Sequence, residues 1–230
     1  MTTSKTIVIA GASRGIGKAI VDLLAKDKSL KIHALSRDLK KMLEIYSEYD
    51  NVECHAIDIG GAEVRKECEK IFVEIDSIDV LINNAGILIN KPFLELTRED
   101  FEVSYDVNVL GAMQTIQAAV PKMMHGHIVN ISSMGGFQGS VKFPGLSAYS
   151  TSKAALCSFT EMFAEEYKKT NIKINCLCLG AVQTEMLQEA FPGYEAPLKP
   201  EKMAEYIVYF ALNAHQWMNG KIIPVSLSTP

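Results

Sequence analysis

The chain has 230 residues, of which 48% are hydrophobic and 22% charged, and this suits one globular domain of ordinary size. The formal net charge of −4 provides no broad basic field, which excludes a protein built around a nucleic-acid surface. No apolar run approaches the ~18 residues that cross a bilayer, and the N-terminus lacks the layout of a signal peptide. We therefore expect a cytoplasmic protein with no membrane partner.

The predicted strands are short apolar runs that alternate with longer helical segments. The strands cover residues 6–10, 31–35, 52–57, 79–83, 127–132, 172–179 and 220–225. The helical segments cover residues 15–26, 38–49, 61–75, 98–124, 150–169 and 200–213. Thr97 with Asp100 resembles a capping box before the fourth helix. The alternation predicts an α/β fold, with one Rossmann-like, doubly wound parallel sheet of about seven strands, helices on both faces, and a single domain over residues 1–230.

The sequence after the first strand is rich in glycine. "IAGASRGIG" places Gly11, Gly15 and Gly17 between that strand and the first helix. Ligands of an open parallel sheet bind beyond the carboxyl ends of its strands, and glycines there let backbone N–H groups approach a pyrophosphate. An ordinary glycine-rich turn is the structural alternative, and no Lys-Ser/Thr follows the last glycine as in a nucleoside-triphosphate P-loop. The position of the motif favours a dinucleotide.

The end of the second strand indicates which dinucleotide is bound. An acid about 20 positions after the glycines binds the ribose 2′-hydroxyl in many such folds, but Ser36 stands there. Arg37 follows it, and Arg14 lies in the glycine loop, so two guanidinium groups are available to a 2′-phosphate. These residues favour NADP(H) over NAD(H). Asp38 leaves an alternative open, because its carboxylate can cap the next helix or turn toward the ribose.

The next two strand ends also offer cofactor contacts. Asp58 can accept a hydrogen bond from an adenine amino group, or it can cap the following helix. "NNAG", residues 83–86, gives a tight turn in which asparagine side chains hold the backbone, with or without a cofactor against it. Both motifs support a nucleotide site without requiring one.

Tyr149 and Lys153 are four residues apart in a predicted helix, so their side chains share one face. An ammonium beside a phenol lowers the phenol's pKa and prepares it for proton transfer. The same spacing occurs by chance between surface neighbours, so the pair alone does not decide the chemistry.

The five cysteines, at positions 54, 68, 157, 176 and 178, show no spacing typical of a metal site or a disulfide. Cys176 and Cys178 fall in a predicted strand, where they share one face as small core residues. The histidines are scattered along the chain. We therefore expect no metal.

Together the motifs resemble the short-chain dehydrogenase/reductase family, in its shorter single-domain branch, which includes 3-oxoacyl-type reductases. The resemblance spans almost the whole chain. It rests on five features in the family's order, which are "GASRGIG", "NNAG", Asn108 in "YDVNVLG", "IVNISS" ending at Ser133, and "YSTSK" from Tyr149 to Lys153.

The resemblance implies a role for each matched residue. Tyr149 resembles the general acid/base, Lys153 its electrostatic partner and a ligand of the nicotinamide ribose, and Ser133 the hydroxyl that binds the substrate oxygen. Asn108 resembles the residue that holds a water linked to Lys153, and a packed polar residue bonded to nearby backbone is the alternative. The predicted cofactor contacts are Gly11, Ser13, Arg14, Gly15, Ile16, Gly17, Ser36, Arg37, Asp58, Ile59, Asn84, Ala85, Gly86, Tyr149, Lys153, Val182 and Thr184.

The family resemblance implies an NADP(H)-dependent oxidoreductase for a small carbonyl or alcohol substrate, assembled as a homodimer or homotetramer through helices 98–124 and 150–169. Segment 185–200 is predicted as a substrate lid, whose apolar residues either line a pocket or simply pack. Leu179 replaces the usual proline, and the segment from Ser133 to Tyr149 is longer than usual. These departures keep open an NADP(H)-binding regulatory or scaffold protein with little turnover. An isomerase or epimerase of the family usually has a C-terminal substrate domain, for which no room remains after residue 225.

Overall fold

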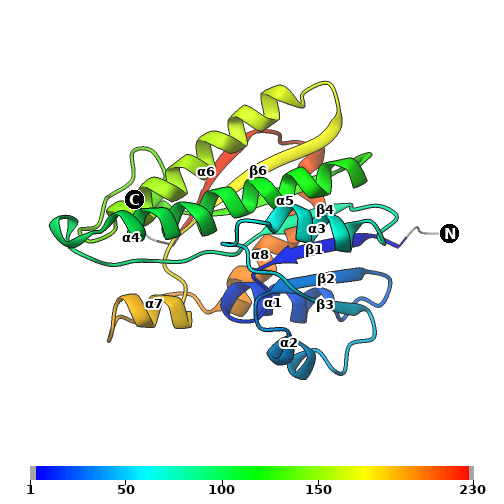
Figure 1. Ribbon diagram of the computed structural model, residues 1–230, viewed down its shortest axis with the longest axis horizontal. Helices are drawn as coiled ribbons and strands as arrows, with labels where there is room; N and C mark the ends of the chain where they lie inside the picture. The colour runs from blue at the N-terminus through cyan, green and yellow to red at the C-terminus, as the bar shows by residue number, and fades with distance from the viewer. Residues whose placement is uncertain (1–3, 228–230) are drawn as a thin grey trace.

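The computed structural model describes residues 4–227 and contains one sheet of seven parallel strands, in the order β3-β2-β1-β4-β5-β6-β7 (Figure 1). The strands are β1 (Thr6–Ala10), β2 (Lys31–Ser36), β3 (Val52–Ala56), β4 (Val80–Asn83), β5 (His125–Ser133), β6 (Asn171–Leu179) and β7 (Lys221–Val225). The predicted sheet is confirmed. The chain winds outward from β1 to β3 and then returns to place β4 on the other side of β1, so the winding direction reverses there. Such a reversal opens a crevice at the carboxyl ends of the strands.

Alternate strand residues face two separate apolar layers. Ile7 and Ile9 of β1 are fully buried against one layer, while Val8, also fully buried, faces the other. The first layer consists of α1 (Gly15–Leu24), α2 (Leu39–Ile45) and α8 (Pro200–Asn213). The second consists of α3 (Val64–Phe72), α5 (Gly111–Ala119) and α6 (Ser147–Glu166). Helices therefore cover both faces, which explains why the central strands β1 and β4 are apolar and buried along almost their whole length.

The segment predicted as one helix over residues 98–124 is interrupted. It consists of α4 (Arg98–Tyr105), a π-helical turn at Asp106–Leu110, and α5. The capping box before α4 is confirmed, because Thr97 Oγ1 accepts from the Asp100 N–H at 3.2 Å and the Asp100 carboxylate accepts from the Thr97 N–H at 2.8 Å. The π-helical turn carries Asn108, which is 1% exposed. Such turns are frequent at functional sites.

The segment after β6 contains a helix that the sequence did not predict, α7 (Glu185–Ala190). The side chain of Thr184 caps it by accepting from the Leu187 N–H at 3.3 Å. A short bridge between Val182 and Leu198 holds the two ends of this segment together. The segment is thus a loop that contains one short helix and whose two ends are paired at the carboxyl end of the sheet. Among the helices of residues 4–227, none combines the length and apolar character that a bilayer-spanning helix requires.

Candidate active site

A cleft of about 790 Å³ lies at the carboxyl ends of the central strands, where the topology predicts a ligand site. It brings together the glycine loop, the ends of β2 to β6, the first turns of α6, and α7. Nearly all predicted site residues line it. They are Gly11, Ser13, Arg14, Gly15, Ile16, Ser36, Arg37, Asp58, Ile59, Asn84, Ala85, Gly86, Ser133, Tyr149, Lys153, Val182 and Thr184. Gly17 and Asn108 do not line the cleft but contact residues that do, which are Gly11 and Ile87 respectively.

The glycine loop is shaped by contacts that exclude side chains. Gly11 has φ +83°, and a Cβ atom there would lie 2.7 Å from the backbone of Ala85. A Cβ atom on Gly17 would lie 1.9 Å from the Gly11 carbonyl oxygen and 2.5 Å from Asn84 Nδ2. The loop therefore folds tightly over the start of α1. The side chain of Arg14, the residue before α1, makes no capping hydrogen bond, so the first-turn amides have no side-chain acceptor.

The "NNAG" turn is bonded to the glycine loop and to the sheet. Asn84 Nδ2 donates to the Gly11 carbonyl at 2.9 Å, and Asn83 Nδ2 donates to Asn130 Oδ1 at 2.9 Å. A Cβ atom on Gly86 would lie 3.2 Å from Asn108 Oδ1 and 3.3 Å from Lys153 Nζ. The structural interpretation of this turn is thus confirmed. The turn also joins the glycine loop to Lys153, so the residues present fit a dinucleotide stretched along the strand ends.

Ser36 and Arg37, at the end of β2, line the cleft. Ser36 Oγ donates to Ser13 Oγ at 2.8 Å, and Arg37 is exposed at the cleft wall. Asp38 accepts from the Lys41 N–H at 3.0 Å, so its carboxylate caps α2 as the alternative interpretation predicted. Arg14 pairs with Glu189 of α7, with 3.1 Å between Nη1 and Oε1. Of the two arginines at this wall, Arg14 is therefore paired with a carboxylate, whereas the ion pairs of residues 4–227 include none with Arg37.

Asp58 lines the cleft and also shapes the turn after β3. Its Oδ1 accepts from the Gly60 N–H at 3.1 Å and so holds the turn, whereas the alternative interpretation, a cap on the following helix, is wrong because Glu63 precedes α3. One carboxylate oxygen can hold this turn while the other faces the cleft. An adenine contact at Asp58 therefore remains a prediction.

Lys153 is the most deeply buried charged side chain of the site, with 4% of its surface exposed. Its ammonium donates to the Ile131 carbonyl at 2.9 Å. Burial lowers the pKa of Lys153 to about 8. The amine therefore changes charge within reach of physiological pH.

Tyr149 stands one helical turn before Lys153 and lines the same cleft. Burial raises the pKa of the Tyr149 phenol, and a hydrogen bond with Ser133 acts in the opposite direction. The expected lowering of this pKa by Lys153 is therefore wrong for the structure as it stands, because the ammonium is directed to the Ile131 carbonyl and burial dominates. The phenol is protonated at neutral pH, which suits proton donation.

The two serines at the end of β5 point in opposite directions. Ser133 interacts with the Tyr149 phenol, and its Oγ accepts from the Gly135 N–H at 3.1 Å. Ser132 Oγ instead donates to the backbone carbonyl of Lys153 in α6 at 2.8 Å. This alternation is what a strand requires, and it leaves Ser133 as the hydroxyl beside the phenol.

Asn108 holds the loop after β4 against α6. Its Oδ1 accepts from the Ile87 N–H at 2.9 Å, and its Nδ2 donates to the Ile87 carbonyl at 3.0 Å and to Ser152 Oγ at 2.9 Å. Two of these bonds are to backbone, so Asn108 is a packed polar residue bonded to nearby backbone, as the alternative interpretation predicted. A water-holding role beside Lys153 remains a prediction.

Sequence reasoning missed part of the apolar wall of the cleft. Ile87 and Leu88 follow β4, Val103 comes from α4, and Val141 and Phe143 come from the long segment before α6. The loop residues carry no periodic signal, so these four positions could not be found by pattern, and Val103 lies on a helix face that the pattern did not assign to the cleft. Four apolar residues of the segment predicted as a lid also line the cleft, as the pocket interpretation expected, and they are Met186, Leu187, Phe191 and Tyr194.

Residues 5–195 match the family described as short chain dehydrogenase. The chain belongs to this family. Among curated relatives, it is 33% identical to the 3-oxoacyl-(acyl-carrier-protein) reductase FabG of Aquifex aeolicus, over 96% of each chain. It is also 33% identical to an uncharacterised oxidoreductase of Staphylococcus saprophyticus, over 89% of this chain and 90% of the relative. Among solved structures, ElxO with NADP bound is 27% identical, with a TM-score of 0.84 and 97% of each chain covered.

Two segments in which the sequence analysis expected departures from the family lie on the cleft wall. Leu179, at the end of β6, is 6% exposed and packs in the first apolar layer. The long segment from Ser133 to Tyr149 begins with a 3-10 turn at Met134–Gly136 and lines the mouth of the cleft. Both features lie where a substrate would enter, and neither displaces Ser133 or Tyr149.

Proposed function

We propose that this short-chain dehydrogenase is an NADP(H)-dependent oxidoreductase that transfers hydride between the nicotinamide and the carbonyl or hydroxyl carbon of a small substrate. The observation that supports this most is the meeting of Ser133, Tyr149 and Lys153, from β5 and α6, on the wall that faces the glycine loop. The nicotinamide supplies the hydride when bound, and the protein supplies position and electrostatics.

The protein's part of the chemistry is proton transfer and charge stabilisation. In the reductive direction Tyr149 donates its phenolic proton to the carbonyl oxygen as that oxygen gains negative charge. The Ser133 hydroxyl donates a hydrogen bond to the same oxygen. The ammonium of Lys153, one turn of α6 away, offers hydrogen-bond donors to ribose hydroxyls. In the oxidative direction each proton moves the opposite way.

The cleft favours a substrate with an apolar body. Around the Ser133–Tyr149 pair, the wall is built mainly from aliphatic and aromatic side chains of four segments, which are Ile87, Leu88, Val103, Val141, Phe143, Met186, Leu187 and Phe191. Burying apolar substrate surface against them contributes to binding without a matching charge. We propose that segment 185–200 closes over this part of the cleft as a lid. A carbonyl on an aliphatic chain, the chemistry in the name of the Aquifex relative, fits this wall.

Arg37 is expected to set the cofactor preference. A charge-assisted hydrogen bond is worth roughly 1.5–3 kcal/mol, and each ~1.4 kcal/mol is tenfold in affinity. Because Arg14 is paired with Glu189, one arginine is expected to engage the 2′-phosphate. NADPH should therefore bind about 10- to 100-fold more tightly than NADH. Arg37→Ala should remove this preference and leave the Kd of NADH unchanged.

Titration calorimetry of both dinucleotides measures this preference. Arg98→Ala is the matched control, because Arg98 is exposed, pairs with Glu102 and lies outside the cleft. Equal affinities for the two dinucleotides in the natural protein would contradict the assignment. So would an Arg37→Ala variant that binds NADH and NADPH equally less well than the natural protein.

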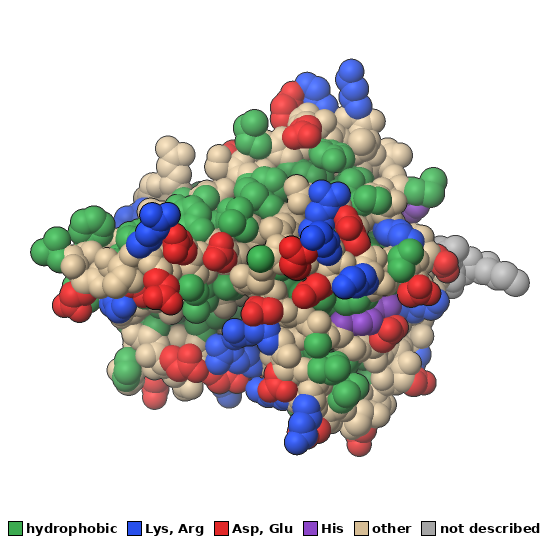
Figure 2. Space-filling view, viewed as in Figure 1, with side chains coloured by type: hydrophobic (Ala, Val, Ile, Leu, Met, Phe, Trp, Pro, Cys, Tyr) green, Lys and Arg blue, Asp and Glu red, His purple; other side chains and the backbone are tan. Residues whose placement is uncertain are grey.

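We also propose a homodimer or homotetramer that pairs α4, α5 and α6. Val109 and Phe163, within the two predicted interface segments, are buried within the chain. Leu110, at the end of the π-helical turn, and Met162, on α6, are exposed at 46% and 66%. Figure 2 shows hydrophobic side chains gathered along the face where α5 and α6 run. Burying such a face against a second copy removes it from water.

Light scattering tests the assembly. The natural chain should have at least twice the 25.3 kDa mass of one copy at micromolar concentration. Met162→Lys should shift it toward a single copy, because the new ammonium would have to leave water. Val73→Lys, at a similarly exposed position at the end of α3, should leave the mass unchanged. A single-copy mass for the natural chain would refute the proposal.

A further inference from the structure

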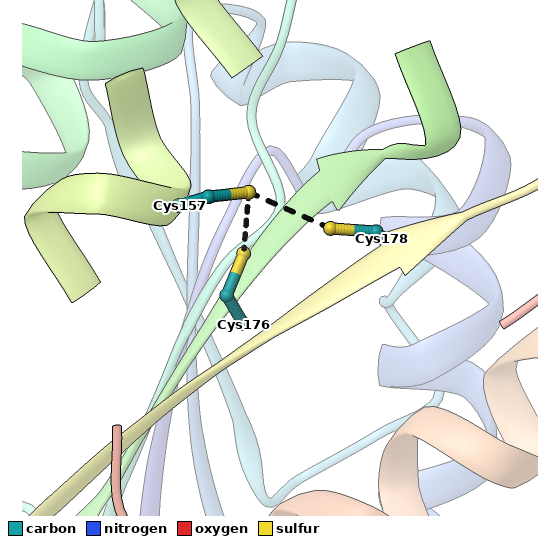
Figure 3. Close-up of side chains that lie close together, drawn as sticks. All are labelled: Cys157, Cys176 and Cys178. Atoms are coloured by element: carbon teal, nitrogen blue, oxygen red, sulfur yellow. Dashed lines mark hydrogen bonds between the residues drawn. The ribbon is translucent and has the colours of Figure 1, made fainter. Parts of the chain in front are cut away.

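Three cysteines that are separated in the sequence meet behind the catalytic wall. The Sγ atom of Cys157, on α6, lies 3.8 Å from that of Cys176 and 3.5 Å from that of Cys178, both on β6 (Figure 3). All three sulfurs lie within 4.8 Å of one another. Cys176 and Cys178 are fully buried, as the shared strand face predicted, and Cys157 is 7% exposed. The two remaining cysteines, Cys54 and Cys68, stand apart on β3 and α3.

The spacing of the sulfurs matches that of thiolates around one metal ion. Thiolates bind Zn²⁺ at ~2.3 Å in a tetrahedral arrangement, which separates neighbouring sulfurs by about 3.8 Å. The two measured separations, 3.5 and 3.8 Å, are close to this value. Ser132 Oγ lies 3.4 Å from the Cys157 sulfur and also interacts with the Cys178 thiol, so it is the oxygen available as a fourth ligand.

The charge around the cluster favours a divalent ion. Three thiolates and one divalent cation carry a net charge of about −1, and a buried charge requires a compensating partner. Lys153 precedes Cys157 by one turn of α6, is 4% exposed, and interacts electrostatically with all three sulfurs. Its ammonium neutralises the complex. A monovalent ion would leave one negative charge buried without a partner.

We propose that Cys157, Cys176 and Cys178 bind one thiophilic divalent cation of the Zn²⁺ class, with the Ser132 hydroxyl as the fourth ligand. Binding breaks three S–H bonds, forms three sulfur–metal bonds and releases three protons to the buffer, with no change of oxidation state. The ion fastens α6 to β6 directly behind Lys153. Phe137 and Ile222, both partly buried, pack against the cluster.

The sequence pattern could not reveal this site. Metal-binding motifs are found by two pairs of ligands at short spacing, whereas here a single cysteine on a helix joins two on a strand. The expectation of no metal, which rested on spacing alone, is replaced by this proposal.

A second group of residues could bind the same ions with nitrogen and oxygen. His33 Nδ1 lies 3.0 Å from His55 Nε2, and the Glu53 carboxylate lies 3.6 and 3.7 Å from the two rings. This group stands on β2 and β3, away from Cys157, Cys176 and Cys178. Simple ion uptake would not separate the two groups, so the measurement must report sulfur ligation.

The experiment is an anaerobic titration of the reduced protein with Cd²⁺, followed by ultraviolet thiolate-to-metal charge-transfer absorption. The absorption should saturate at one equivalent per chain, and Zn²⁺ should displace it. Cys157→Ala and Cys178→Ala should each weaken binding at least ~100-fold, because each removes a ligand. Cys68→Ala, at another buried cysteine, and His55→Gln should leave the titration unchanged. Far-ultraviolet circular dichroism without metal establishes that each variant is folded.

The titration of the natural protein is decisive by itself. Absence of the charge-transfer band in the folded, reduced protein would overturn the proposal. A band that survives in the Cys157→Ala/Cys176→Ala/Cys178→Ala variant would also overturn it, as would a loss in Cys68→Ala equal to that in Cys157→Ala. Thermal melting gives an independent result, because Zn²⁺ should raise the Tm of the natural protein and leave that of folded Cys157→Ala unchanged.

Discussion

Tyr149→Phe is expected to lower turnover by ~10²–10⁴-fold. The variant should keep the natural fold and bind NADPH with a Kd close to that of the natural protein. The phenol is the group beside Ser133 whose proton can reach a substrate oxygen, and phenylalanine retains its shape without that proton. Burial keeps the pKa of Tyr149 above its ordinary value, so the natural enzyme has a proton to donate throughout the neutral range.

The measurement is steady-state oxidation of NADPH with an active carbonyl substrate, together with fluorescence titration of NADPH binding. Tyr194→Phe is the matched control, because Tyr194 also lines the cleft but stands on the lid. It should keep most of the turnover. A Tyr149→Phe enzyme with near-normal kcat would remove the proposed mechanism, whatever the affinity for NADPH.

Lys153→Met is expected to lose both turnover and cofactor affinity. The substitution removes the ammonium that offers donors to ribose hydroxyls, so the nicotinamide is no longer held in position for hydride transfer. Burial lowers the pKa of Lys153 to about 8, so NADPH binding by the natural protein should weaken as pH rises through 8. In Lys153→Met this step of the pH profile should be absent. A natural protein whose Kd for NADPH does not change between pH 7 and about 9 would contradict the role of the ammonium.

Stability gives an independent test of the same lysine. The folded pKa of about 8 lies below the ordinary value of 10.5, so the unfolded chain binds more protons than the folded chain between these values. Lys153 therefore destabilises the fold at pH 7, and this cost disappears as pH rises through that window. The free energy of unfolding of Lys153→Met should equal or exceed that of the natural protein at pH 7. A lower value at pH 7 would show that the amine stabilises the fold.

The sheet was predictable because its signals are local. Apolar runs of strand length, separated by helical segments, fix a doubly wound sheet, and every strand lies where its run predicted it. The glycine loop was equally readable, since Gly11 and Gly17 occupy positions where any Cβ atom would collide with backbone.

The features that the sequence did not reveal depend on contacts between distant segments. The π-helical turn around Asn108 interrupts an apolar pattern that continues without a break, and the hydrogen bonds of Asn108 reach Ile87 on another segment. The pKa of Tyr149 depends on burial and on where the Lys153 ammonium points, and spacing along a helix reports neither. Asp38 and Asp58 had two interpretations each, and hydrogen bonds to Lys41 and Gly60 identify their local roles.

The most direct test of the proposed function is NADPH consumption by the natural protein and by Tyr149→Phe, measured in parallel against a panel of aliphatic and aromatic ketones and aldehydes. NADPH binding is measured for both on the same preparations. We predict that both proteins bind NADPH, that the natural protein oxidises it with at least one carbonyl, and that Tyr149→Phe does so at least ~100-fold more slowly. Tight NADPH binding without turnover on any carbonyl would instead indicate a regulatory or scaffold protein, and equal rates for the two proteins would contradict the role of Tyr149.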